Sequence, residues 1–153
     1  MPSFVLTDTN ILLRIADPAH PMYQTAADAV EVLRQRGDIP CLAPQNLIEY
    51  RAVCTRPVRD NGLGMDPQQI QIEFARLKRY FPVFEERPQV FAEWERLVDT
   101  YGAIGKQNHD ARLVAAMNVH GIRAILTFNK RDFVRYPDLT VWEPKDLLAT
   151  PST

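Results

Sequence analysis

Short apolar segments alternate with longer amphipathic segments along this chain, and this alternation constrains the fold most strongly. The first apolar segment spans residues 4–7, and the clearest one in the second half spans residues 124–127. Such segments are typical of buried strands, and strands separated by helices form a mainly parallel sheet that is covered on both faces. We therefore predict an α/β fold with four to five short strands.

Hydrophobic spacing, Pro and Gly place the expected elements. Strands are expected at residues 4–7, 39–43, 124–127 and 140–142, and helices at 11–15, 22–36, 44–54, 67–81, 88–101, 109–120, 129–136 and 145–148. No strand is expected between Pro44 and Tyr101, so this helix-rich middle should pack as a layer or as a protruding helix pair. At 153 residues, we expect a single domain over 1–148 and a C-terminal tail at 149–153.

Composition excludes several classes of protein. The net charge of -1 excludes a strongly basic nucleic-acid-binding protein, although not a local basic patch. Ser3 and Ser152 are the only serines, which argues against a Ser-His-Asp hydrolase. Cys41 and Cys54 are isolated, so we expect core residues in a reducing cytoplasm and no zinc site. We find no signal peptide and no membrane span, and expect neither export nor membrane insertion.

Two acidic residues stand in apolar surroundings in the first half of the chain. Asp8 directly follows the first strand, and ligands of parallel sheets bind at the carboxyl ends of strands. Alternatively, Asp8 caps the next helix. Glu49 falls within a nearly continuous apolar arc of its helix. It lines a pocket, pairs with a cation such as Arg51 or Arg56, or is simply a partly exposed helix residue.

Two further acids occupy comparable places in the second half. Asp110 extends the apolar face formed by Leu113 and Met117 to the first turn of its helix, where the helix dipole also favours a carboxylate. Asp132 comes three residues after Asn129, which is the spacing of a capping box. For both acids, capping and a functional role remain open.

Together, the four acids have a chemical logic. Four carboxylates in one crevice repel one another and raise their own pKa values. A hard divalent cation offsets this repulsion, and oxygen ligands without Cys or His suit Mg²⁺ or Mn²⁺. Such a site is suited to the attack of a metal-activated water on a phosphodiester.

Four motifs in this chain resemble the PIN domain: L-T-D-T-N at 6–10, N-L-I-E at 46–49, H-D-A-R-L-V-A-A at 109–116 and I-L-T-F-N-K-R-D-F at 125–133. The resemblance covers nearly the whole chain, and the compact size is similar to that of VapC-type toxins of bacterial toxin–antitoxin pairs. It implies a three-layer α/β/α sandwich and an endoribonuclease that depends on Mg²⁺ or Mn²⁺. It also implies a homodimer and an inhibitory antitoxin partner.

The resemblance also assigns roles by motif. Asp8, Glu49 and Asp110 match the first three acids of the family. Many members have a fourth acid where this chain has Asn129, and Asp132 supplies the nearest carboxylate. We expect Asp8, Asp110 and Asp132 to hold the metal and Glu49 to act through water. Supporting contacts are expected from Thr7, Asn10, Thr127 and Asn129.

A nearly neutral nuclease needs local cations to hold RNA phosphates. The candidates lie close to the acids in sequence or on the loop at 56–64: Arg14, Arg51, Arg112, Lys130, Arg131, Arg56 and Arg59. Two alternatives remain for the whole protein. One is a catalytically weak PIN-like module that binds RNA or a partner. The other is a receiver-type Mg²⁺-binding signalling domain.

Overall fold

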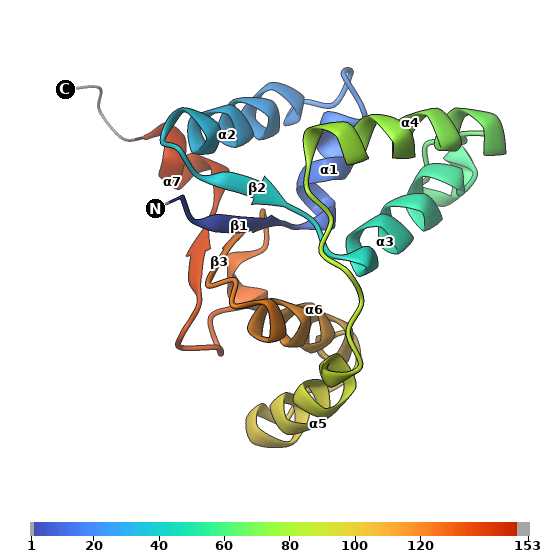
Figure 1. Cartoon of the computed structure of the whole chain (residues 1–153). Coiled ribbons are helices and arrows are strands. Elements are labelled where there is room, and N and C mark those ends of the chain that lie inside the picture. The colour runs from blue at the N-terminus through green and yellow to red at the C-terminus, as the bar shows by residue number, and fades with distance from the viewer. Residues whose placement is uncertain (1, 150–153) are drawn as a thin grey trace.

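A four-stranded parallel sheet forms the centre of the protein. The computed structural model describes residues 2–149. The strands β1 (Phe4–Thr7), β2 (Ile39–Cys41), β3 (Ala124–Leu126) and β4 (Thr140–Trp142) are arranged in the order β2-β1-β3-β4, and every neighbouring pair is parallel (Figure 1). The predicted parallel sheet is confirmed, and its carboxyl ends all lie at one edge.

Helices cover both faces of this sheet. The helices α1 (Thr9–Ile15), α2 (Tyr23–Gln35) and α7 (Pro144–Leu148) lie on one face, and α5 (Gln89–Tyr101) and α6 (Gln107–His120) lie on the other (Figure 1). Alternate strand residues serve the two cores: Val5 and Leu126 pack in the first, Leu6 and Ile125 in the second. The expected three-layer α/β/α sandwich is confirmed.

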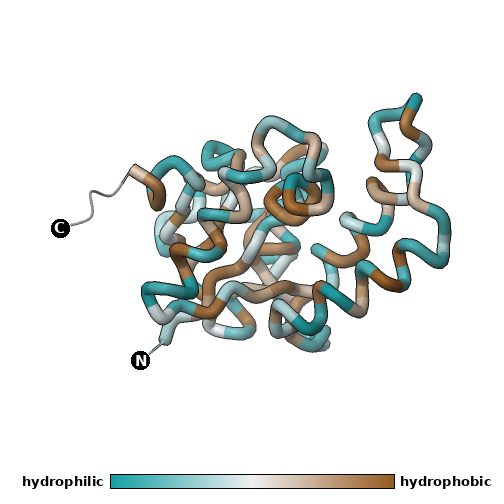
Figure 2. The backbone as a smooth tube through the Cα atoms, turned by 90° about the horizontal axis from the view of Figure 1, so that it is seen from above, coloured by the Kyte–Doolittle hydropathy of each residue, from teal (hydrophilic) through white to brown (hydrophobic). Residues whose placement is uncertain are grey.

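The remaining helices, α3 (Pro44–Thr55) and α4 (Pro67–Tyr80), project from one side of the molecule (Figures 1 and 2). A short 3-10 helix, η1 (Val58–Asp60), lies between them. Their facing apolar residues, including Tyr50 and Ile70, join the first core. Figure 2 shows hydrophobic residues running through the middle of the molecule. Of the two arrangements left open for the helix-rich middle, α3 and α4 form the protruding pair, while α5 packs in a layer (Figure 1).

The helix expected at 129–136 is wrong. Only a 3-10 helix, η2 (Lys130–Asp132), forms there, and the chain continues in turns whose N–H groups bond three residues back, as from Tyr136 N to Phe133 O at 3.2 Å. Pro137 accounts only for the end of this segment at Tyr136, because a residue that precedes proline disfavours the α conformation. The first helix also begins earlier than expected, at Thr9.

The sequence also led to expectations for the two cysteines, the C-terminal tail and membrane-spanning segments. Cys41 and Cys54 are both fully buried with free thiols, as predicted for core residues. Of the predicted tail at 149–153, all but Ala149 lies outside the described residues. Within residues 2–149, no helix has the combined length and apolar character that a bilayer crossing requires.

Candidate active site

The carboxyl ends of β1 and β3 are joined to each other, and they carry the first predicted site residues. Asp8 follows β1, and its backbone N–H donates to Leu126 O at 2.9 Å. Thr127 follows β3, and its hydroxyl donates to Asp8 Oδ2 at 2.7 Å. The Asp8 carboxylate is therefore fixed at the point where the two strands end.

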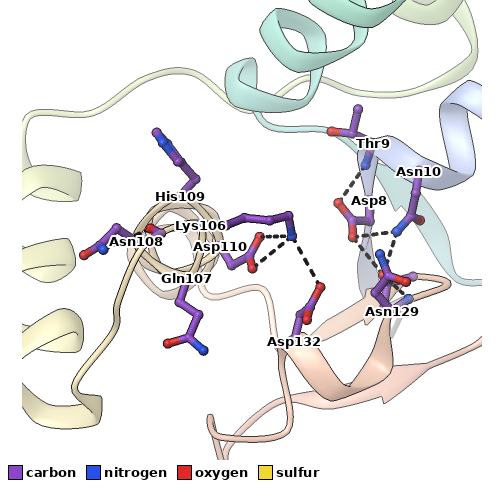
Figure 3. A network of polar contacts seen from close by, with 12 residues as sticks. Asp8, Thr9, Asn10, Lys106, Gln107, Asn108, His109, Asp110, Asn129 and Asp132 are labelled. Carbon is purple, nitrogen blue, oxygen red and sulfur yellow. Dashed lines mark hydrogen bonds and ion pairs between the residues drawn. The ribbon is translucent and has the colours of Figure 1, made fainter. Parts of the chain in front are cut away.

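Asn10 ties this group together. Its Nδ2 lies 3.3 Å from Asp8 Oδ2 and 3.2 Å from Thr127 Oγ1, and its Oδ1 accepts from the Phe128 N–H at 3.2 Å (Figure 3). Asn129 takes part through its backbone N–H, which donates to Thr127 Oγ1 at 3.0 Å. Thr7 differs, because its buried hydroxyl has no hydrogen-bond partner among residues 2–149.

The Asp8 carboxylate is held in an unfavourable environment for a charge. Burial raises its pKa to about 6, although hydrogen bonds from Thr127 and Thr9 act in the opposite direction. The negative charges of Glu49 and Asp110 raise the pKa further. Asp8 also caps α1, since its Oδ1 accepts from the Thr9 N–H at 2.8 Å. The capping interpretation is thus correct, and it coexists with the contacts at the strand ends.

Glu49 reaches the same region from α3. The Thr9 hydroxyl donates to Glu49 Oε1 at 2.9 Å and lies 3.3 Å from Asn46 Nδ2. Asn46 is fully buried, and its Oδ1 accepts from the Ala43 N–H at 2.9 Å at the start of the helix. Glu49 is therefore oriented by a chain of polar contacts. Among the described residues it forms no ion pair with Arg51 or Arg56.

Asp110 and Asp132 share one cation. Lys106 precedes α6, and its Nζ lies 3.4 Å from Asp110 Oδ2 and 3.4 Å from Asp132 Oδ2 (Figure 3). Burial lowers the pKa of Lys106, but attraction to the two carboxylates outweighs it and leaves the pKa above its ordinary value. The alternative interpretation of Asn129 and Asp132 as a capping box is wrong. The Asn129 side chain accepts no hydrogen bond from the first turn, and the Asp132 carboxylate contacts Lys106.

The four acids interact electrostatically across these two groups. Burial raises the pKa of Asp110, the nearby Lys106 lowers it, and the charges of Asp132 and Glu49 raise it again. Asp8 is subject to Glu49 and Asp110 in the same way. As they stand, no three Asp, Glu, His or Cys residues within 2–149 are grouped closely enough to ligate one ion. Lys106 lies between two of these acids, Asp110 and Asp132.

A family profile described as the PIN domain matches residues 5–139 of this chain. The chain belongs to the PIN domain family. The resemblance noted in the four sequence motifs is thereby confirmed, and the receiver-type alternative is wrong. No curated protein sequence matches the chain.

Solved structures show the same fold for this PIN domain. DNA-bound VapBC from Salmonella typhimurium has a TM-score of 0.67 and 16% identity, covering 94% of this chain and 99% of that chain. VapBC2 from Rickettsia felis, bound to a DNA fragment from its promoter, has a TM-score of 0.66 and 13% identity, covering 92% and 98%. VapC20 from Mycobacterium tuberculosis, a sarcin-ricin loop cleaving toxin, has a TM-score of 0.57 and 17% identity, covering 79% and 86%.

The basic candidates of this PIN domain differ in their surroundings. Arg112 is already engaged, because its guanidinium lies 3.0 Å from Glu86 Oε1 and 3.3 Å from Gln45 Oε1. Lys130 lies 3.8 Å from Asp146 Oδ2. Most of the others lie on the exposed surface, namely Arg51, Arg131, Arg56 and Arg59, whereas Arg14 is partly buried. Arg112 is the weakest candidate for a phosphate contact.

Sequence reasoning missed several residues that position the acids of the PIN domain. Gln45 is buried and donates to His109 O at 2.8 Å, which fixes the start of α3 against the start of α6. Asn46 and Thr9 orient Glu49. One signal was available for Asn46, because an Asn three residues after the N-cap can bond back to it. Lys106 was also missed, because no local pattern links it to Asp132, which lies 26 residues away on η2.

Proposed function

We propose that this PIN domain is an endoribonuclease that hydrolyses RNA phosphodiester bonds with Mg²⁺ or Mn²⁺. The observation that carries the proposal is the sharing of the Lys106 ammonium by Asp110 and Asp132. Two carboxylates from different elements aim at one position that attracts a cation. The negative charge of Glu49 raises the pKa of both Asp110 and Asp8, and that of Asp110 raises the pKa of Asp8.

The donor set fits a hard divalent cation. The candidate ligands Asp8, Asp110 and Asp132 offer carboxylate oxygens alone, which Mg²⁺ and Mn²⁺ prefer. When bound, the cation would lower the pKa of a nearby water and neutralise charge on the phosphate oxygens. Glu49, which Thr9 orients, would position the attacking water.

The residues around Asp8 prepare its carboxylate for this task. The Asp8 carboxylate is partly buried, and the Thr127 hydroxyl and the Asn10 amide both donate to its Oδ2. These two hydrogen bonds hold the carboxylate in place. With a pKa of about 6, Asp8 is mostly ionised at pH 7 and is available as a ligand. Its fixed position reduces the ordering needed when a metal and an RNA phosphate bind.

We further infer that the chain is the toxin of a toxin–antitoxin pair that acts in the cytoplasm as a homodimer. The support is the family match and the shared fold with VapBC proteins. Expression should arrest the growth of a bacterial host, and the Asp8→Asn variant should not. Growth arrest by folded Asp8→Asn protein would contradict a nuclease toxin.

A catalytically weak PIN domain that only binds RNA or a partner is the second candidate. Asn129 favours it, since many family members carry an acid at this position, and so does the net charge of -1. Incubation of a labelled RNA with the purified protein and Mn²⁺ separates the two. The proposed nuclease cleaves the RNA, and EDTA stops the reaction. RNA binding without cleavage by the wild-type protein supports the second candidate.

A further inference from the structure

Lys106 occupies an unusual position, because one exposed lysine contacts two acids of the candidate site. Its Nζ lies 3.5 Å and 3.4 Å from the two oxygens of Asp110 and 3.4 Å from Asp132 Oδ2 (Figure 3). Asp110 is one helical turn away, whereas Asp132 is 26 residues away on η2. Helix geometry explains the contact of Lys106 with Asp110 but not its contact with Asp132.

The charges of these three residues balance only in part. Two carboxylates face one ammonium, and the repulsion between the acids is offset without being removed. The side chains of Asp110 and Asp132 are 17% and 29% exposed, while that of Lys106 is 73% exposed. The acids are therefore held inside the site, and their cation reaches them from the solvent side.

We propose that Lys106 is a built-in counter-cation that holds Asp110 and Asp132 in the metal-free protein and must leave when a divalent cation binds them. This inference rests on the proposed metal-dependent function. Lys106 is thus a positioning residue. It keeps Asp110 and Asp132 together when no metal is bound, and it raises the concentration of metal needed to fill the site.

Lys106 and a divalent cation cannot favourably sit beside the same two carboxylates, because both are positively charged. Mg²⁺ binds carboxylate oxygens at about 2.1 Å. An ammonium 3.4 Å from the same two carboxylates would then lie within a few ångströms of a doubly charged ion. Repulsion at such a distance exceeds the small gain from an exposed ion pair.

Release of Lys106 is also feasible. Its three contacts of 3.4–3.5 Å are longer than the ~2.7–2.9 Å of strong charge-assisted hydrogen bonds. The side chain is unbranched and mostly exposed, so it can turn into solvent without disturbing the core. The contacts are thus weak enough for a divalent cation to break.

Calorimetric titration of the full chain with Mn²⁺ tests this inference. Lys106→Met removes the charge and keeps an unbranched side chain, whereas Lys106→Arg keeps the charge. Lys78→Met on α4 is the matched control, because Lys78 is exposed and forms no hydrogen bond or ion pair with the site acids within residues 2–149. It reproduces the change in net charge at a distance from the site.

Lys106→Met should bind Mn²⁺ about fivefold more tightly than the wild type, since two exposed ion pairs no longer compete. Lys106→Arg and Lys78→Met should stay within about twofold of the wild type. In EDTA, Lys106→Met should also have a lower Tm, and Mn²⁺ should raise its Tm by more than that of the wild type. A purely structural ion pair predicts no gain in affinity when it is removed.

Two results overturn the inference, and they are distinguishable. Saturable Mn²⁺ binding with equal or weaker affinity in Lys106→Met overturns the competition by Lys106 and leaves the proposed metal centre intact. The absence of Mn²⁺ binding in both the wild type and Lys106→Met overturns the metal centre, and the inference with it. Lys106→Gln provides a second neutral variant if the methionine variant does not fold.

Discussion

The Thr127 hydroxyl donates a 2.7 Å hydrogen bond to Asp8 Oδ2, which joins residues 119 positions apart at the ends of two adjacent parallel strands. The bond favours the ionised carboxylate, while burial favours the neutral one. Burial has the larger effect, so the pKa of Asp8 is raised from its usual value to about 6.

Replacement of Asp8 by Asn should abolish cleavage and preserve the fold. The Asn side chain can still accept from Thr127, but it carries no negative charge for a divalent cation. The rate should fall by more than the ~10–100-fold that loss of a supporting contact costs. Single-turnover cleavage of a labelled RNA measures the effect, and circular dichroism checks the fold. Cleavage at the wild-type rate by the folded variant would refute the role of Asp8.

The stability of the metal-free protein should depend on the protonation of Asp8. Its pKa rises from 3.8 to about 6 on folding, so the folded protein binds this proton more tightly than the unfolded chain. The resulting stability is present below pH ~4 and is lost as the pH rises to ~6, by about 3 kcal/mol. The Asp8→Asn variant does not lose this stability as the pH rises. Urea unfolding in EDTA should therefore show the variant gaining on the wild type between pH 4.5 and pH 7, and a constant difference would contradict the account.

Loss of the Thr127 hydroxyl should weaken metal binding. Thr127→Val keeps the shape of the buried side chain but removes the 2.7 Å bond to Asp8. The pKa of Asp8 should rise further, and Mn²⁺ affinity should fall by ~10–100-fold. Thr127→Ser retains the donor and serves as the control in the same calorimetric titration. Equal affinities for the Val and Ser variants would show that the hydroxyl has no part in the site.

The positions of these residues could be predicted from sequence to different extents. Asp8 and Thr127 follow short apolar strands, and parallel strands bring their carboxyl ends to one edge, so a local pattern was sufficient. Asp110 could be placed because it extends the apolar face of its own helix. In each case, a rule that acts over a few residues determines where the side chain lies.

Contacts between distant segments could not be predicted in this way. The spacing of Asn129 and Asp132 favours a capping box, but in the folded chain the Asn129 N–H donates to Thr127 Oγ1 and Asp132 contacts Lys106. The bond from Thr9 to Glu49 spans 40 residues and depends on how α3 packs beside α1. The helix pattern singles out Glu49 but not its partner Thr9, because only the folded chain brings the two together.

Substitution of Thr9 should separate the role of Glu49 in cleavage from the role of the metal-binding acids. Thr9→Val removes the 2.9 Å bond to Glu49 Oε1 and leaves Asp110 and Asp132 untouched. The cleavage rate should fall by about tenfold, while Mn²⁺ affinity changes by no more than about twofold. Thr9→Ser should restore the rate. A parallel loss of affinity and rate in Thr9→Val would instead place Glu49 among the direct metal ligands.

The central claim is that distant acids form one metal-dependent catalytic centre, and one Mn²⁺ titration tests it most directly. Binding and RNA cleavage are followed together for the wild type and for Asp110→Asn, at the same protein and metal concentrations. The account predicts that both signals rise over the same range of Mn²⁺ in the wild type and that both are lost in the variant. Cleavage that persists in EDTA, or wild-type binding and cleavage by Asp110→Asn, would contradict it.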